Sequence, residues 1–235
     1  MGLVKLKRDG KMLNMDITWL GHSAFRLKGK QGVMVIDPFD PKKVGIAWSK
    51  QKADIVTVSH QHEDHNYLDG VGETDTRKEF GVFVIKGPGE YEAGGMFVQG
   101  WATFHDQTSG SERGKNTVYL IEVDRIRVLH LGDLGHQLSE KLIEEIGQVD
   151  VLLVPVGGVY TIGHEQAAKV VRAISPSYAI PMHYQINETT PALANKLEGL
   201  QEFLQEFGVS PEPMEKLTVT EGSLPEDTQI VVLKI

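Results

Sequence analysis

The stretch V-S-H-Q-H-E-D-H, residues 58–65, holds three of the nine histidines of the chain and two acidic residues. The apolar run directly before it predicts a buried β-strand. On an extended backbone, residues two apart point the same way, so His60 and His62 can direct their imidazoles to one point beyond the strand. Asp64 and His65 follow where the chain must turn. We therefore interpret these four side chains as metal ligands.

The ligand types limit which metal the stretch can bind. Imidazole combined with carboxylate, in a chain without cysteine, suits zinc, iron or manganese better than calcium or magnesium. Four ligands in one turn cannot all bind one tetrahedral ion and leave an open position. Either further ligands complete two ions, or some of these residues support the others. Further candidates are Asp133 in H-L-G-D-L-G-H, His183 in I-P-M-H-Y and His105 in F-H-D.

These further candidates lie at or just beyond the ends of segments that are predicted to be strands. In the N-terminal half we expect strands at Asp16–Leu20, Ala24–Lys28, Val33–Ile36, Ile55–Val58, Val82–Ile85, Met96–Phe104, Thr117–Val123 and Ile126–Leu131. In the second half we expect helices near Leu138–Ile146, Glu165–Ile174 and Ala192–Phe207, and strands at Val151–Val154, Tyr178–Ile180, Leu217–Val219 and Ile230–Ile235. This order predicts an α/β protein in which sheets are covered by helices in layers, and not a doubly wound Rossmann sheet.

Composition sets the expected organisation. The chain has 235 residues and is 40% hydrophobic, which is ample for a buried core. Because no low-complexity linker separates the halves, we predict a single domain over residues 1–235. Residues 1–14 would be a flexible basic tail whose charges are solvated.

Charge and cysteine content indicate the expected partners and location. The net charge of −8 disfavours a nucleic-acid substrate, which normally requires a basic footprint. The apolar runs are far shorter than the roughly 20 residues that cross a bilayer, and no apolar signal segment follows the basic start. The absence of cysteine fits the reducing cytoplasm. We expect a cytoplasmic protein that acts on a small molecule and has no membrane contact.

Five motifs in order give the chain a family resemblance. The series V-I-D-P-F, H-Q-H-E-D-H, F-H-D, L-G-D-L-G-H and I-P-M-H-Y lies between Trp19 and Tyr184. It resembles the metallo-β-lactamase superfamily, in its branch of small metal-dependent hydrolases. The resemblance implies a four-layer αββα sandwich with a dinuclear site in the cleft between the sheets. It also implies two divalent metal ions, zinc first, with iron or manganese as alternatives.

The resemblance further implies a role for each matching residue. The implied ligands are, for the first ion, His60, His62 and His105; for the second ion, Asp64, His65 and His183; and for both ions, as a bridge, Asp133. Asp37 would orient one of the ligands from behind.

One departure from the family pattern concerns the third ligand of the first ion. Many members place it in a G-H-T-x-G-H turn, whereas here F-H-D leads into the polar loop Q-T-S-G-S-E-R-G-K-N. His130, three residues before Asp133, is therefore an alternative to His105.

Two such ions would lower the pKa of a shared water, so that a bridging hydroxide could attack an ester, lactone, amide or phosphodiester bond. Asp64 is expected to take or orient the proton of this water. His22, His136 or a metal-bound water could donate a proton to the leaving group, and for each histidine a packing or surface role is the alternative. The loops Tyr67–Glu79 and Gln107–Asn116 are expected to shape the pocket.

Other polar features have weaker signals. His164 is expected at the surface near a helix start, and Asn116 could bind substrate or close a turn. The glycine-rich stretch 87–95 predicts a pair of turns. The stretch 155–161 could bind an anionic group through its backbone N–H groups.

Two alternative functions stay open at this level. One is a nuclease or phosphodiesterase that acts on nucleic acid, which the acidic composition disfavours. The other is a metal-binding sensor that keeps the ligands without turnover.

Overall fold

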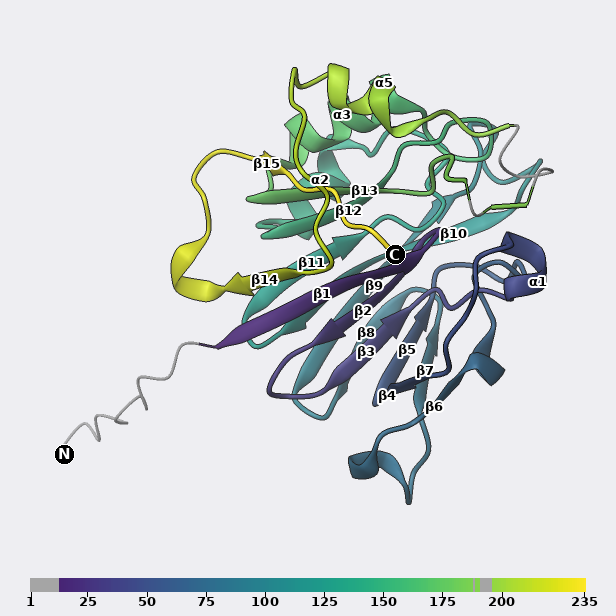
Figure 1. The fold of residues 1–235 in the computed structure, drawn as a ribbon, viewed down its shortest axis with the longest axis vertical. Coiled ribbons are helices and arrows are strands. Elements are labelled where there is room, and N and C mark those ends of the chain that lie inside the picture. Colours follow the sequence, from purple (N-terminus) through teal and green to yellow (C-terminus); the bar gives the residue numbers. More distant parts are fainter. Residues whose placement is uncertain (1–12, 188, 191–195) are drawn as a thin grey trace, which may run out of the picture.

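The computed structural model describes residues 13–187, 189–190 and 196–235 (Figure 1). The predicted basic tail lies outside these residues except for its last two, and Asn14 already begins the first strand. Two β-sheets face one another, and side chains from both sheets form one hydrophobic core. This arrangement confirms the predicted mixed α/β class with stacked sheets.

The first sheet has six strands in the order β14-β1-β2-β3-β5-β7. Their bounds are β1 Asn14–Gly21, β2 Ala24–Lys28, β3 Val33–Ile36, β5 Ile55–Val58, β7 Phe83–Lys86 and β14 Leu217–Thr220. Strands β3, β5 and β7 are parallel to one another. The carboxyl ends of β3 and β5 therefore meet at one edge, where Asp37 and His60 follow.

The second sheet has seven strands in the order β15-β13-β12-β11-β10-β9-β8. Their bounds are β8 Gly89–Ala93, β9 Met96–Phe104, β10 Lys115–Val123, β11 Ile126–His130, β12 Val151–Pro155, β13 Tyr178–Met182 and β15 Gln229–Ile230. Strands β11, β12 and β13 are parallel. Their carboxyl ends also lie at one edge, where Asp133 and His183 follow.

Burial patterns explain how the two sheets are covered. In β1 the buried residues alternate with partly exposed ones, as expected for a strand with one face on the core. All five residues of β12 are buried, which is typical of a parallel strand covered on both faces. Figure 1 shows helices along the side of this sheet that faces away from the first sheet: α2 Glu140–Ile146, α3 His164–Ile174 and α5 Leu200–Gln205. Among the described residues, no helix is long and apolar enough to cross a membrane.

The outer face of the first sheet has a different cover. The short parallel pair β4 Gln51–Ala53 and β6 Val71–Glu73 lies there with 3-10 helices at Leu68–Gly70 and Asp75–Arg77. Leu68 and Val71 pack against the apolar cluster of Val35, Ala53, Val56 and Val58. The prediction that Tyr67–Glu79 shapes the pocket is therefore wrong, because the apolar side chains of this segment cover the sheet. The remaining short helices are α1 Pro41–Val44 and a 3-10 turn at Glu221–Ser223.

Three element boundaries differ from expectation. The helix expected at Ala192–Phe207 is α5 alone where described, since the backbone of Glu198 bonds to Gly157 and Gln185 instead of continuing a helix. Residues 191–195 lie outside the described residues. The expected strand Ile230–Ile235 is reduced to β15 and an isolated bridge between Leu233 and Met214. The turns expected at 87–95 enclose β8, which pairs with the long strand β9.

Tyr119 of β10 connects the two sheets through its hydroxyl group. The hydroxyl donates to the carbonyl oxygen of Val58 at 3.0 Å and accepts the N–H of Gly87 at 2.7 Å. We expect Tyr119→Phe to lower the free energy of unfolding in urea by about 1–3 kcal/mol, because it leaves both backbone groups unpaired. Tyr178→Phe is the control, because it also deletes a tyrosine hydroxyl group, but one that makes no hydrogen bond to a described residue. It should therefore change the free energy of unfolding far less. Equal effects of the two substitutions would contradict this account.

Candidate metal centre

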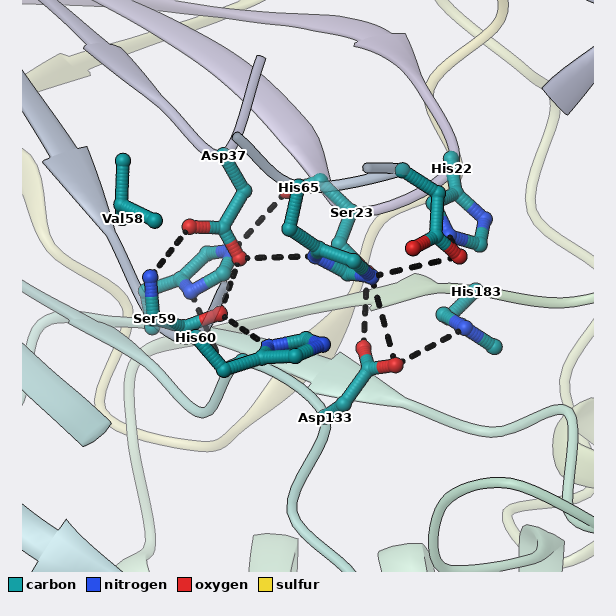
Figure 2. A network of polar contacts seen from close by, with 12 residues as sticks. His22, Ser23, Asp37, Val58, Ser59, His60, His65, Asp133 and His183 are labelled. Carbon is teal, nitrogen blue, oxygen red and sulfur yellow. Dashed lines mark hydrogen bonds and ion pairs between the residues drawn. The ribbon is translucent and has the colours of Figure 1, made fainter. Parts of the chain in front are cut away.

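Six segments bring the predicted site residues to one edge of the facing sheets. The turn between β1 and β2 supplies His22, and the segments that follow β3 and β5 supply Asp37 and His60 to His65. The segments that follow β9, β11 and β13 supply His105, Asp133 and His183, in that order. Figure 2 shows the central part of this cluster, with its side chains pointing toward one another. The sheet topology thus places close together residues that are far apart in the sequence.

Asp37 organises one side of the cluster (Figure 2). Its carboxylate accepts the N–H of Ser59 at 2.7 Å, the hydroxyl of Ser59 at 2.5 Å and Nδ1 of His65 at 3.0 Å. Because a carboxylate can only accept, His65 carries its proton on Nδ1 and turns Nε2 toward the cluster. The hydroxyl oxygen of Ser59 in turn accepts from Nδ1 of His60 at 2.9 Å. The geometry is the one that the orienting role of Asp37 requires.

His60, His62 and His105 form the first group of histidines. One ring nitrogen of each lies within 4.8 Å of the others. The ring centroid of His60 lies 4.6 Å from that of His62 and 4.8 Å from that of His105. His60 and His105 are buried, while His62 is exposed and leaves one side of the group open.

His22, His65 and His183 form the second group, again within 4.8 Å. All three are buried, and the ring centroids of His22 and His183 lie 4.2 Å apart. The carboxylate of Asp64 lies beside them, 3.3 Å from Nε2 of His22 and 3.9 Å from Nε2 of His65. The structure therefore brings together the three residues that the resemblance assigns to a second ion. It adds His22, for which the sequence analysis leaves a proton-donor role and a packing role open.

Asp133 lies between the two groups, and Figure 2 shows its contacts with His65 and His183 of the second group. Its Oδ2 is 3.4 Å from Nε2 of His105 in the first group. The same oxygen is 3.3 Å from Nε2 of His65 and 3.2 Å from Nε2 of His183 in the second group. Ser23 donates its hydroxyl to the other oxygen, Oδ1, at 3.3 Å. This is the position that a bridging ligand needs.

The loop that carries Asp133 is held by Asn116. The side-chain oxygen of Asn116 accepts the N–H of Asp133 at 3.0 Å, and its amide donates to the carbonyl of Leu131 at 2.9 Å. Gly132 has φ +54°, and a Cβ there would overlap the side chains of Asn116 and Ser59. Asn116 therefore positions the loop. Of the two roles predicted for it, substrate binding and closing a turn, the structure favours the structural one.

Three residues of the cluster have left-handed backbone conformations. The φ angles are 53° for His22, 43° for Asp37 and 53° for His183. Such conformations cost non-glycine residues on the order of 1–3 kcal/mol each and are concentrated at functional sites. The surrounding structure stabilises them, since the carbonyl oxygen of His22 accepts the indole N–H of Trp19 at 3.0 Å and the N–H of His183 at 3.1 Å.

The electrostatics of the cluster favour a cation. Burial and the neighbouring His183 lower the pKa of His22 to about 4, and burial with His65 lowers that of His60 to about 3. Burial alone would raise the pKa of Asp64, but the charge of His65 holds it well below its usual range. Burial lowers the pKa of His65, yet Asp133 and Asp64 raise it well above its ordinary value. Positive charge is thus stabilised between the two carboxylates.

His130, the alternative to His105, has no ring nitrogen available for a metal. Its Nε2 donates to the carbonyl of Ser23 at 2.9 Å, and its Nδ1 accepts the N–H of Gly132 at 3.0 Å. It is fully buried. The geometry therefore favours His105, which lies in the first group.

His136 and His164 lie outside the cluster. Nε2 of His136 accepts the N–H of Phe104 at 3.2 Å, and Nδ1 donates to the carbonyl of Gln137 at 2.8 Å. With both nitrogens bound to the backbone, His136 does not have the geometry of the predicted proton donor. His164 begins α3 near the surface, as expected, and contacts Glu198 at 2.9 Å.

A cavity of about 420 Å³ opens onto the cluster. Five of the residues that line it belong to the predicted site: His62, Asp64, His105, Asp133 and His183. The other five are called the rim residues here: Lys43, Arg113, Tyr160, Thr190 and Lys196. Sequence reasoning named none of the five rim residues individually, although Arg113 belongs to the loop Gln107–Asn116 and Tyr160 to the stretch 155–161, both of which it had considered for the pocket.

Three backbone N–H groups of the glycine-rich stretch 155–161 already have partners. The N–H groups of Gly158, Tyr160 and Thr161 bond to carbonyls of the same loop region. They are therefore not free to bind an anion. The loop contributes the side chain of Tyr160 instead.

Comparison with known proteins identifies the family of this chain. A family model described as a β-lactamase superfamily domain matches residues 16–183, a range that includes every predicted metal ligand. A crystal structure of a candidate Zn-dependent hydrolase of the metallo-β-lactamase superfamily from Thermotoga maritima has a TM-score of 0.72 and 36% identity, and covers 94% of this chain and 100% of that one. The chain belongs to the metallo-β-lactamase superfamily.

Two further proteins resemble the chain over most of its length. A UPF0173 metal-dependent hydrolase from Korarchaeum cryptofilum is 32% identical over 218 residues, which is 83% of this chain and 93% of that protein. The structure of Igni18, a metallo hydrolase from Ignicoccus hospitalis, has a TM-score of 0.64 at 24% identity and covers 88% of this chain and 98% of that one. At that identity, Igni18 shows that the fold is shared.

The side chains of this superfamily member fit divalent metal ions. Three buried ring nitrogens that face the cluster make no well-formed hydrogen bond to a described residue: Nε2 of His22, His60 and His65. Leaving buried polar atoms unpaired is costly, so such a concentration indicates a missing partner. Nitrogen and carboxylate donors without sulfur suit zinc, iron or manganese.

The Asp37 network gives a testable consequence. We expect Asp37→Asn to weaken binding of divalent metal by about 10- to 100-fold, because it removes the charge that fixes His65 and, through Ser59, His60. Competition with a chelator measures this affinity. Asp16→Asn removes a carboxylate that bonds to Lys216 and Thr218 away from the cluster, and should leave it unchanged. Equal metal affinities of Asp37→Asn and Asp16→Asn would contradict the orienting role.

Proposed function

We propose that this protein is a hydrolase that depends on two divalent metal ions, zinc in the first instance. One observation carries the proposal. The Oδ2 atom of Asp133 has Nε2 of His105 on one side and Nε2 of His65 and His183 on the other, all within 3.2–3.4 Å. One carboxylate oxygen between two groups of imidazoles is the arrangement expected of a ligand shared by two ions.

The proposed ligands follow the two histidine groups. They are, for the first ion, His60, His62 and His105; for the second ion, Asp64, His65 and His183, with His22 beside them; and for both ions, Asp133. We assign His22 to the second ion and not to proton transfer. Its Nε2 is buried in the second group, 3.3 Å from the carboxylate of Asp64, and its side chain does not line the cavity.

The reaction would be hydrolysis of an ester, lactone, amide or phosphodiester bond. Bound as a pair, the ions would supply an activated water near neutral pH and stabilise negative charge on the attacked group. Asp64 is the residue placed to accept the proton of that water, because its carboxylate contacts the second group and also lines the cavity. His62, which is exposed, borders the cavity from the first group.

The cavity supports a small substrate. Its volume of about 420 Å³ falls within the range of small-molecule sites, roughly 300–1,000 Å³. The net charge of −8 speaks against a nucleic-acid substrate. We further propose that the protein acts in the cytoplasm, which the absence of cysteine supports.

The most direct functional test uses His62→Ala. Because His62 is exposed, its replacement should leave the fold intact, so metal content and turnover can be compared in folded protein. We expect bound metal to fall from about two equivalents to about one, and turnover of model phosphodiesters, lactones or β-lactams to fall by more than about 100-fold. Metal analysis and steady-state kinetics measure the two effects.

Gln61→Ala is the matched control, since Gln61 is exposed in the same loop and bonds to Asn66. It should retain both metal and turnover. Full activity in a metal-stripped sample would end the proposal. Full metal occupancy with no turnover over a broad panel would favour the sensor function instead.

A further inference from the structure

Positive charge surrounds the metal centre, against the acidic balance of the chain. A second hollow, of about 450 Å³, adjoins the first, and both are lined by His62 and Arg113. The cations that line the two hollows are Lys43, Lys86, Arg113, Lys115 and Lys196. The carboxylates in the two linings are Asp64 and Asp133, which belong to the metal centre. The rest of the lining therefore presents cations to a ligand.

Arg113 occupies the central position of this cationic lining and is held there by its own loop. The loop follows His105 and closes around the buried carboxylate of Asp106. That carboxylate accepts the N–H groups of Thr108 at 2.9 Å, Gly110 at 2.7 Å, Glu112 at 3.0 Å and Arg113 at 2.8 Å. Asp106 thus fixes the backbone of Arg113 next to a proposed ligand of the first ion.

The ionisation of Asp106 supports this role. Burial would raise the pKa of its carboxyl group, but the N–H groups of Arg113, Gly110 and Glu112 hold it well below its usual range. The loop is also packed closely against the Asp133 segment, since a Cβ at Gly135 would overlap the backbone of His105 and Asp106. The guanidinium group is therefore carried by a pre-organised loop.

Two of the rim cations meet at one aromatic ring. The guanidinium carbon of Arg113 lies 5.7 Å from the ring centroid of Tyr160, and Nζ of Lys196 lies 5.8 Å from it. Such contacts with an aromatic ring orient a cation without neutralising it. The nearest carboxylate contact of Arg113 is a long one, 3.8 Å to Glu112. Lys43 differs, because Glu63 pairs with it at 2.5 Å.

We propose that the substrate carries an anionic oxygen group, a carboxylate or a phosphate, apart from the bond that is cleaved, and that Arg113 and Lys196 bind this group at the rim of the cavity. The inference rests on the proposed hydrolase function and names its substrate class. A planar guanidinium fork suits both kinds of anion. Asp106 acts as a positioning residue for Arg113.

The test compares substrates with the same scissile bond. Three aryl benzoates carry at the para position a carboxylate, a phosphonate or a neutral carboxamide. They are assayed with metal-loaded wild-type protein, Arg113→Gln, Arg113→Lys and Lys141→Gln. Lys141→Gln removes one positive charge at an exposed site on α2, outside the cavity, and is the matched control. For each ester, the ratio of kcat/KM for the wild type to kcat/KM for the variant does not depend on the intrinsic reactivity of that ester.

We expect Arg113→Gln to lower kcat/KM for the anionic esters by about 10- to 100-fold, mainly through KM, because it removes a charged hydrogen bond. Turnover of the carboxamide ester should change by less than about threefold, which is the size of effect expected from the loss of one exposed charge. Arg113→Lys should restore part of the loss, since it keeps the charge and lacks the fork. The preference between carboxylate and phosphonate identifies which anion the rim favours.

Calorimetric binding of terephthalate to the metal-loaded proteins gives a readout that does not need turnover. Arg113→Gln should weaken this binding by about tenfold or more at unchanged metal content, and Lys141→Gln should not. If no ester is hydrolysed but terephthalate binding still depends on Arg113, ester hydrolysis fails and anion recognition stands. Equal losses for charged and neutral esters, or unchanged terephthalate binding, would overturn the inference. Displacement of terephthalate by a short single-stranded oligonucleotide with steep salt dependence would overturn the small-molecule substrate.

Discussion

The contact on which the whole arrangement depends is the approach of three imidazole nitrogens to one oxygen of Asp133. His65, His105 and His183 reach this oxygen from loops that follow strands of both sheets, so the two sheets must be held in one relative position. The hydroxyl of Tyr119, the network around Asp37 and the anchoring of the Asp133 loop by Asn116 all serve this requirement. A buried cluster with unpaired nitrogens is costly by itself, and divalent cations would make it favourable.

Much of this centre follows from the sequence because its signals are local. The spacing of His60, His62, Asp64 and His65 behind an apolar strand predicts a crowded metal site, and Asp133 and His183 follow predicted strands of their own. The fold class follows from the order of strands and helices, and from the family resemblance. The start of helix α5 cannot be predicted from the sequence, because the backbone of Glu198 forms tertiary hydrogen bonds that local helix propensity does not encode.

The features that sequence reasoning missed depend on tertiary contacts. The position of His22 beside His65 and His183 arises from a left-handed backbone turn and from the bond between its carbonyl oxygen and the N–H of His183. The difference between His105 and His130 depends on which ring nitrogens the backbone already occupies. Arg113 lies at the cavity because the carboxylate of Asp106 binds backbone N–H groups of the polar loop that carries it. The residues after His105 that depart from the family pattern therefore form an ordered loop that places Arg113. The proposed substrate specificity thus rests on loops that are carried by the two facing sheets.

The most direct test of the shared-ligand geometry is anomalous X-ray scattering at the zinc absorption edge from crystals of the zinc-loaded protein. The account predicts two peaks about 3.5–4 Å apart, as in dinuclear sites generally. One peak should lie among His60, His62 and His105, the other beside His65 and His183, and Asp133 should contact both. A single peak, or a pair of peaks that Asp133 does not join, would contradict the central claim.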